Sequence, residues 1–203
     1  YSMSSLEGLQ KWTHIAVVAD GSDSTFYING QQVGNTVSYV INETVQRIGG
    51  TPSADQTFAE ALDEFAYWDI ALEDCEIFEI YKESKSLLNS ALTNLEESRF
   101  STLYGDASIN SGILTLDDGD DDYAVYGGEF RFSDQFSVSV WFKTGAGLSD
   151  NNVIFSNHDA GQLPNGNVVS IKTNGKIRVK TLDSGQGPVG DAQDLGSNLN
   201  DGE

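Results

Sequence analysis

Residues 12–30 read WTHIAVVADGSDSTFYING, and this stretch decides the fold class. Residues 12–19 form an almost unbroken apolar run, which is typical of a strand buried at the centre of a sheet. The polar residues 20–23 predict a turn into a second strand at residues 25–28. Asn29-Gly30 then predicts a tight hairpin, because both residue types tolerate positive φ. The stretch therefore predicts consecutive antiparallel strands.

The second half of the chain shows the same pattern. Asn174-Gly175 separates two strand-like runs, residues 168–172 and 176–180. In residues 136–142, Phe and Val alternate with Ser, so one face of that strand should belong to a core. Trp141 falls on the opposite face, and its burial requires that the sheet is covered on both sides.

One helix is predicted, from about Asp74 to Ser84. Apolar residues at positions 77, 80 and 81 fall at helical spacing, and acidic and basic residues occupy the other side. Glu73 stands where the helix cap is expected, and Glu76 is placed to complete a capping box. The sequence thus predicts an all-β, antiparallel β-sandwich with one short helix near residues 74–84.

Composition narrows the range of partners. The chain has 203 residues and a formal net charge of −20. Such a charge repels nucleic acid and anionic membranes, so neither is expected as a partner. No run approaches the roughly 20 apolar residues that a membrane-spanning helix needs, so direct membrane insertion of these residues is not expected.

Several motifs together resemble a known family. Residues 12–18, 26–30 and 62–68 resemble the second half of a laminin-G-like jelly-roll domain of the concanavalin-like superfamily. Residues 112–123 and 136–144 resemble its first half. The resemblance implies a concanavalin-like jelly roll, with residues 1–91 as the C-terminal half of one domain and residues 92–203 as the N-terminal half of a second domain, or of the same domain permuted.

Three explanations of the inverted order stay open. The chain is a slice of a tandem array, a circular permutant, or a subunit whose halves complete sandwiches with neighbouring copies. A tandem array would repeat about every 192 residues, and the chain would be an excerpt or a processed product. We expect a half from another copy or an adjacent repeat to complete each core, because a lone half-sandwich exposes sheet edges. Internal closure would instead place residues 12–19 beside residues 136–143.

The candidate metal ligands are acidic. Five aspartates lie at residues 117–122, and their density predicts Ca²⁺ ligation by Asp118, Asp120 and Asp121. The alternative is that this segment holds a turn by hydrogen bonds from side chain to backbone. By resemblance to related sandwich proteins, Asp63 is expected either to be a structural calcium ligand or to be a solvated strand residue.

A ligand rim is expected at one end of the sandwich. Asn157, His158 and Asp159 lie in a loop between predicted strands, where this superfamily tends to place ligand contacts. Asp20 and Asp23 would lie opposite that loop. Their amide, imidazole and carboxylate groups suit sugar hydroxyls or a metal, and the alternative is a polar loop without such a role.

Three further residues have structural or processing interpretations. Asn42 begins a glycosylation triplet, Asn-Glu-Thr, which favours an extracellular or cell-surface location. Cys75, the only cysteine, is expected to be a small buried residue of the first helical turn, with a bridge outside these residues or a reactive thiol as alternatives. His14 is expected to be a structural imidazole with its hydrogen bonds satisfied.

No catalytic arrangement is evident, because the sequence lacks paired strand carboxylates and a nucleophile elbow. We therefore expect a non-enzymatic extracellular structural or adhesive protein that assembles with copies of itself or with adjacent repeats, including as filaments. The alternative is a carbohydrate-binding module, calcium-dependent or not, whose partners are glycans. That alternative requires solvent-facing aromatic residues. Trp12, Trp68 and Trp141 fall at core or sheet positions, whereas Tyr39, Tyr104 and Tyr126 are left open.

Overall fold

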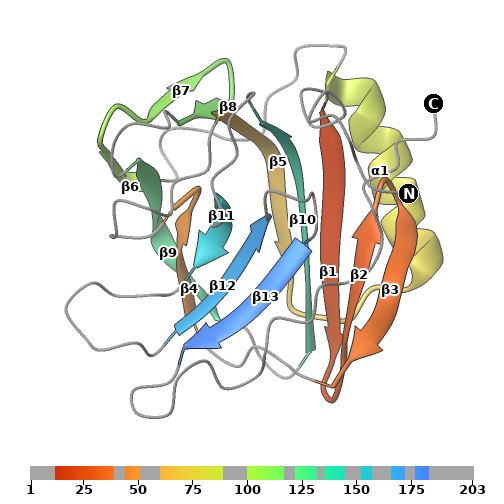
Figure 1. The fold of residues 1–203 in the computed structure, drawn as a ribbon. Coiled ribbons are helices and arrows are strands. Elements are labelled where there is room, and N and C mark those ends of the chain that lie inside the picture. Colours follow the sequence, from red (N-terminus) through yellow and green to blue (C-terminus); the bar gives the residue numbers. More distant parts are fainter. Residues whose placement is uncertain are drawn as a thin grey trace, which may run out of the picture.

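A computed structural model describes residues 12–38, 44–50, 60–88, 100–116, 122–131, 135–144, 152–156, 166–171 and 177–182 (Figure 1). Within these ranges the chain forms strands and one helix. The elements are β1 (Thr13–Asp20), β2 (Ser24–Ile28), β3 (Gln31–Val37), β4 (Thr44–Ile48), β5 (Glu60–Trp68), α1 (Asp74–Leu88), β6 (Phe100–Tyr104), β7 (Ser108–Asn110), β8 (Ile113–Thr115), β9 (Tyr123–Arg131), β10 (Gln135–Thr144), β11 (Asn152–Ser156), β12 (Gly166–Ile171) and β13 (Ile177–Leu182).

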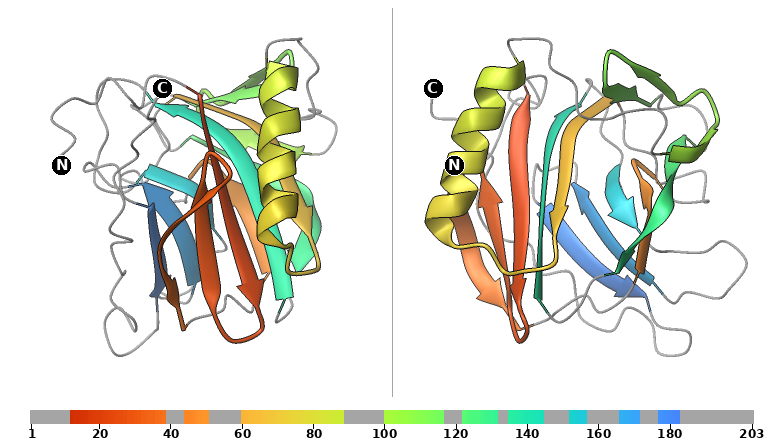
Figure 2. Two further views of the ribbon diagram at one scale, coloured as in Figure 1. Left: turned by 90° about the vertical axis from the view of Figure 1, so that its right-hand side faces the viewer. Right: turned by 180° about the vertical axis from the view of Figure 1, so that it is seen from behind.

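The strands form two antiparallel sheets that face each other. Sheet A has the order β3-β2-β1-β10-β5-β8-β7, and sheet B has the order β13-β12-β11-β4-β9-β6, for the strands that the structure describes. In Figure 2 the two sheets lie side by side as separate layers. This arrangement is a concanavalin-like β-sandwich, and it confirms the predicted fold class.

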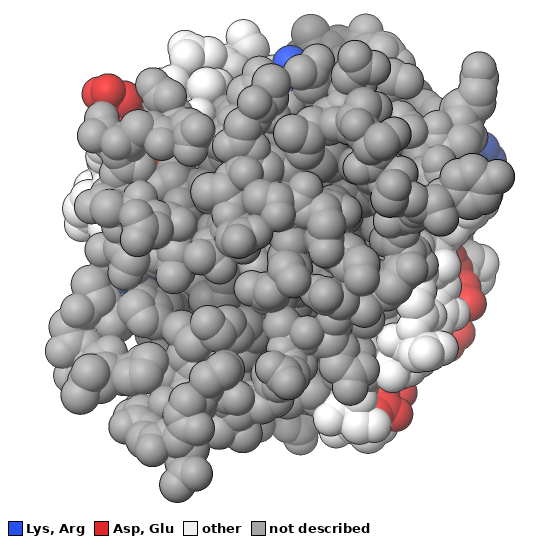
Figure 3. Space-filling model, viewed as in Figure 1, with Lys and Arg blue, Asp and Glu red and all other residues white. Residues whose placement is uncertain are grey.

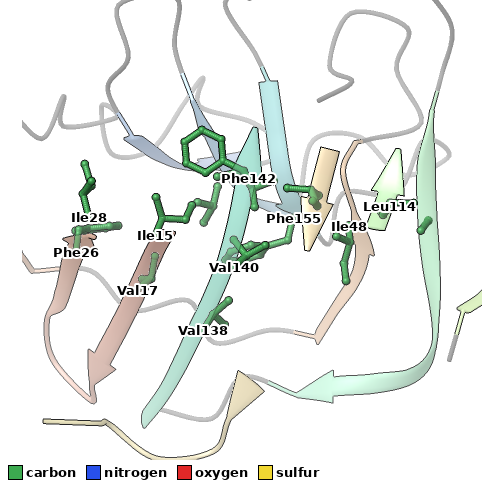
Figure 4. Close-up of a cluster of buried hydrophobic side chains, with 14 of the residues drawn as sticks. Ile15, Val17, Phe26, Ile28, Ile48, Leu114, Val138, Val140, Phe142 and Phe155 are labelled. Atoms are coloured by element: carbon green, nitrogen blue, oxygen red, sulfur yellow. The ribbon is translucent and has the colours of Figure 1, made fainter. Parts of the chain in front are cut away.

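The core lies between the sheets. Phe136, Val138, Val140 and Phe142 alternate along β10 and all point into it, as their spacing predicts. Side chains from β1 and β2 meet them from the same sheet, and Ile48 and Phe155 meet them from sheet B (Figure 4). These side chains are at most 8% exposed, so burial of this layer supplies most of the hydrophobic stabilisation.

The predicted hairpins are formed by the expected residues. β2 and β3 pair through Asn29 and Gly30, whose φ angles are 49° and 75°. Positive φ at both central residues is the geometry that a two-residue hairpin turn needs. β12 and β13 also pair in antiparallel fashion. Asn174-Gly175 itself lies outside the described residues.

Strands from the two halves of the chain alternate within each sheet. β10, from the second half, lies between β1 and β5 of the first half. β4, from the first half, lies between β11 and β9 of the second. The pairing of β1 with β10 places Val17 opposite Val138 in the same chain, which is the internal-closure arrangement. Exchange of halves between copies would use the same contacts, so the division at residues 91 and 92 stays a prediction.

Helix α1 is longer than predicted, since it begins at Asp74 as expected but ends at Leu88. Its start has one half of the predicted capping box, because the Glu73 backbone N–H donates to Glu76 Oε2 at 2.8 Å, while the Glu76 backbone N–H donates to the Glu73 carbonyl. The helix lies on the outer face of sheet A (Figure 2). There it forms a second apolar cluster, which contains Ala16, Val18, Tyr27, Leu72 and Ile77.

This helix explains the burial of Trp141. The side chain points away from the main core, and it is 2% exposed because α1 covers it. Sheet A is therefore covered on both faces at β10, as the alternation required. Cys75, in contrast, is exposed in the first turn of α1. The prediction that it is buried was wrong, because the apolar side of this helix begins at Ile77 and position 75 faces solvent.

Candidate functional site

An exposed aromatic pair lies on sheet B. Tyr104, at the end of edge strand β6, is directly opposite Tyr123 of β9. Their ring centroids are 4.4 Å apart and the rings are nearly parallel, at 14°. Tyr123 is 7% exposed and Tyr104 is 43% exposed, so Tyr104 covers Tyr123 and presents its own ring to solvent. Such cross-strand aromatic pairs stabilise a sheet and hold both rings in place.

A guanidinium extends the pair. Arg47 of β4 lies over the Tyr123 ring, with its Cζ atom 5.8 Å from the ring centroid. The neighbours of these residues, Ile48 and Ala124, belong to the core. Since successive side chains of a strand point to opposite faces, Arg47 and Tyr123 lie on the outer face of sheet B. A cation and two aromatic rings therefore share one face of the sandwich.

The turn after Tyr104 is held by a buried carboxylate. Asp122, which is 0% exposed, accepts a hydrogen bond from the Asp106 backbone N–H at 2.7 Å. Gly105 lies between Tyr104 and Asp106 with φ of 66°, and a Cβ added there would collide with Asp122 Oδ1. Only glycine fits at this position. Asp122 thus holds a turn by a hydrogen bond from backbone to side chain, but this turn lies at Gly105 and Asp106. The alternative that the acidic segment holds a turn of its own stays a prediction, because residues 117–121 lie outside the described residues.

Asp20 and Asp23 occupy a turn of their own. Asp20 Oδ1 accepts hydrogen bonds from the backbone N–H of Ser22 and of Asp23, both at 2.9 Å, and from Ser22 Oγ at 3.0 Å. The bond from Asp23 contributes most to a pKa of Asp20 below its ordinary value. Asp20 Oδ1 therefore holds the turn between β1 and β2. The predicted role of Asp20 and Asp23 in a ligand rim stays a prediction.

Asp63 lies at an irregularity of β5. Pairing with β10 shifts register between Ser139 and Trp141, and Glu64 has a φ of 51°, which marks a bulge. Asp63 is 4% exposed, and its Oδ1 accepts the Glu64 backbone N–H at 2.8 Å. Burial raises the pKa of Asp63 to about 6. The expectation of a solvated strand residue does not match this burial.

Asp63 has few candidate calcium ligands beside it among the described residues. Ca²⁺ takes six to eight oxygen ligands. Within the described ranges, no group of three or more acidic, histidine or cysteine side chains could hold a metal ion. The other predicted ligands, Asp118, Asp120 and Asp121, lie outside the described residues, and calcium ligation stays a prediction.

Other predicted site residues also lie outside the described part of the chain. They are Asn157, His158 and Asp159 of the expected rim loop and Asn42 of the glycosylation triplet. The structure describes His14, which is buried as a structural imidazole would be but lacks the expected hydrogen bonds to described residues. The imidazole is buried, at 0% exposure, but among the described residues neither ring nitrogen has a hydrogen-bond partner.

Acidic side chains show at the surface near the helix. In Figure 3 they line the right-hand edge, on the side where Figure 1 places α1. Asp74 and Glu76 lie in the first turn of α1, where they complement the helix dipole. Within the described residues, no helix is long and apolar enough to span a membrane.

The fold and the two-sided cover of sheet A define a concanavalin-like sandwich, and comparison with known families agrees. Residues 2–78 match a laminin-G family of the concanavalin A-like lectin/glucanases superfamily. The predicted resemblance is thereby confirmed for this part of the chain. Domains of this type are typically extracellular and generally non-enzymatic. No curated protein and no solved structure matches the chain significantly.

Sequence reasoning left one part of this site open and missed another. The sequence leaves open whether Tyr104 is exposed, and no motif singles out Arg47. Tyr123 was part of the acidic signature. The residues are separated by up to 76 positions, and only the pairing of β4, β9 and β6 brings them together. Alternation around Ala124 was the available hint, since it places Tyr123 on an outer face.

Proposed function

We propose that this chain is a non-enzymatic extracellular adhesion module that binds carbohydrate at Tyr104. The observation that carries the proposal is the exposed ring of Tyr104, held flat against Tyr123. A preorganised aromatic ring offers an apolar face to a sugar ring and loses little conformational entropy on binding. The hydroxyl of Tyr104 supplies a polar group for sugar hydroxyls, and Arg47 lies over the Tyr123 ring that supports it.

Charge supports a neutral glycan as the ligand. The formal net charge of −20 repels sulfated and sialylated chains over the distance of their approach. A neutral hexose or N-acetylhexosamine chain meets no such repulsion. We therefore expect the glycan partners of this adhesion module to be neutral oligosaccharides.

The test is binding to a panel of neutral and acidic oligosaccharides, followed by titration calorimetry on those that bind. We expect Tyr104→Ala to weaken binding by about 1 kcal/mol, which is about fivefold in Kd. Tyr104→Phe keeps the ring and should retain most of the affinity. Phe78→Ala, which removes an aromatic residue that is 44% exposed on α1, is the matched control and should bind as the unaltered protein does.

Two results contradict the proposal. One is that no oligosaccharide of the panel binds. The other is that Tyr104→Ala and Phe78→Ala have equal affinity, because the exposed ring of Tyr104 would then contribute nothing specific.

A second candidate function is assembly with other copies by exchange of halves. The alternation of strands from the two halves supports it, because β10 fits between β1 and β5 whichever copy supplies it. Heterologous exchange that does not close would give head-to-tail filaments. Light scattering with and without a calcium chelator tests this candidate. Large species would support it, and particles of one chain's mass in both conditions would contradict it.

A further inference from the structure

His14 is a buried titratable group that the proposed function does not use. It lies on the outer face of β1, under α1, with 0% exposure. Its ring packs against Trp141 of β10 at a centroid distance of 5.4 Å and against Tyr81 of α1 at 5.8 Å. Among the described residues, neither ring nitrogen has a hydrogen-bond partner. The imidazole is therefore held between the sheet and the helix by packing alone.

Among the residues that the structure describes, the two rings that pack against the imidazole, those of Tyr81 and Trp141, carry no negative charge. From α1 the groups around the imidazole are the Tyr81 phenol and Ser84, whose hydroxyl donates to Ile80 O and accepts from Trp141 Nε1. From β10, Lys143 lies on the same face as Trp141. Beyond Trp141, across β10, lies Asp63 of β5.

The backbone of His14 is hydrogen-bonded to Asn29 in the hairpin between β2 and β3. Asn29 Oδ1 accepts the backbone N–H of His14 at 3.1 Å, and the Asn29 backbone N–H donates to His14 O at 2.9 Å, so neither bond involves the ring. Burial is the cause that lowers the pKa of His14 to about 4. A proton on this ring would have to be accommodated without water and without an acceptor, unless the helix moves.

Helix α1 is attached separately from the main core. Its cluster on sheet A is distinct from the cluster between the sheets. Among the described residues, Tyr27 Oη donates to Asp74 Oδ1 at 2.6 Å and Trp141 Nε1 donates to Ser84 Oγ at 2.8 Å. The segment just before the helix is held as well, because the Leu72 backbone N–H donates to Ser137 Oγ at 2.9 Å. The helix can therefore leave sheet A without opening the layer between the sheets, as a local unit of lower stability.

We propose that α1 is an acid-released cover on sheet A, in which protonation of His14 detaches the helix from β1 and β10 while the sandwich stays closed. The packed state favours the neutral imidazole, and the released state exposes it to water. The stabilisation of the docked helix is thus complete above about pH 6.5 and is lost as pH falls towards 4. Over that window the equilibrium constant for release rises up to about tenfold per pH unit.

Amide hydrogen exchange of the whole chain at pH 7.0, 6.0 and 5.0 tests the proposal. After correction for intrinsic exchange rates, we expect opening of α1 to increase about tenfold per unit below pH 6.5, while β1 and β10 keep their protection. His14→Phe keeps a ring that cannot titrate, and its α1 opening should not depend on pH.

His158→Gln removes the other histidine and is the control, which should behave as the unaltered protein does. The proposal is overturned when α1, β1 and β10 open together with the same constant, since that is global unfolding. It is also overturned when His14→Phe keeps the pH dependence. Should His14→Phe not fold, an NMR titration of His14 in His158→Gln decides: a ring that titrates near its ordinary pKa, with α1 still protected, overturns it.

Discussion

Trp141 and Ser84 are joined by a hydrogen bond of 2.8 Å from the indole Nε1 to Oγ. The two residues are 57 positions apart, and the bond ties the middle of β10 to the last turns of α1. Ser84 donates in turn to Ile80 O at 2.6 Å, so one hydroxyl satisfies a buried indole and a helix carbonyl. This contact fastens the cover of sheet A to a strand of the other half of the chain.

Ser84→Ala should destabilise the protein, because it leaves the Trp141 Nε1–H buried without an acceptor. We expect a loss of about 1–3 kcal/mol in the free energy of unfolding. Urea unfolding followed by circular dichroism measures it. Glu79→Ala, on the exposed side of the same helix, is the control and should change stability by less than about 0.5 kcal/mol. Equal effects of the two substitutions would show that the Trp141 contact is not important.

Gly105→Ala should be more harmful than a glycine substitution elsewhere with the same φ. The added methyl group would collide with Asp122 Oδ1 and disturb the turn that follows Tyr104. We expect a loss of more than about 2 kcal/mol, whereas Gly34→Ala, with φ of 68° at an exposed position, should cost about 1 kcal/mol. Thermal unfolding of both variants measures the difference. Similar losses would mean that strain at positive φ, rather than the contact with Asp122, dominates.

Asp63 should make stability fall as pH rises. Its pKa is raised from 3.8 to about 6 by burial, so its stabilising contribution is complete below pH 3.8 and is lost as pH rises through about 6. Asp63→Asn removes this loss. We expect the variant to gain roughly 1–2 kcal/mol relative to the unaltered protein between pH 4 and pH 7, after allowance for partial solvation. Urea unfolding at both pH values tests this, and a pH-independent difference between the two proteins would count against it.

Calcium should stabilise the chain if the acidic segment and Asp63 ligate it. We expect added Ca²⁺ to raise the unfolding temperature, and a chelator to reverse the increase, because a ligand that binds the native state stabilises it by mass action. The triple variant Asp118→Asn, Asp120→Asn, Asp121→Asn should lose the increase, and Asp23→Ala should keep it. If millimolar Ca²⁺ does not change the unfolding temperature of the unaltered protein, the prediction of a calcium site is wrong.

The local structure was largely predictable from residue order. Apolar alternation at residues 136–142 placed one side of β10 in the core, and Asn29-Gly30 predicted the hairpin, because strand facing and turn geometry depend on neighbours in sequence. Helix α1 was predicted from its start, and its end at Leu88 was not. The sequence has no glycine or proline between Ser84 and Leu88, so no local signal marks where the helix ends.

The sequence by itself determined the class of fold, the hairpin and the start of the helix, since these depend on interactions within a few residues. Tertiary structure alone decided that β10 lies between β1 and β5, that Tyr104 stacks on Tyr123 beside Arg47, and that His14 is enclosed under Tyr81. These contacts join residues far apart in the chain. Their formation depends on which strands pair and on what covers each face, and no local pattern contains that information.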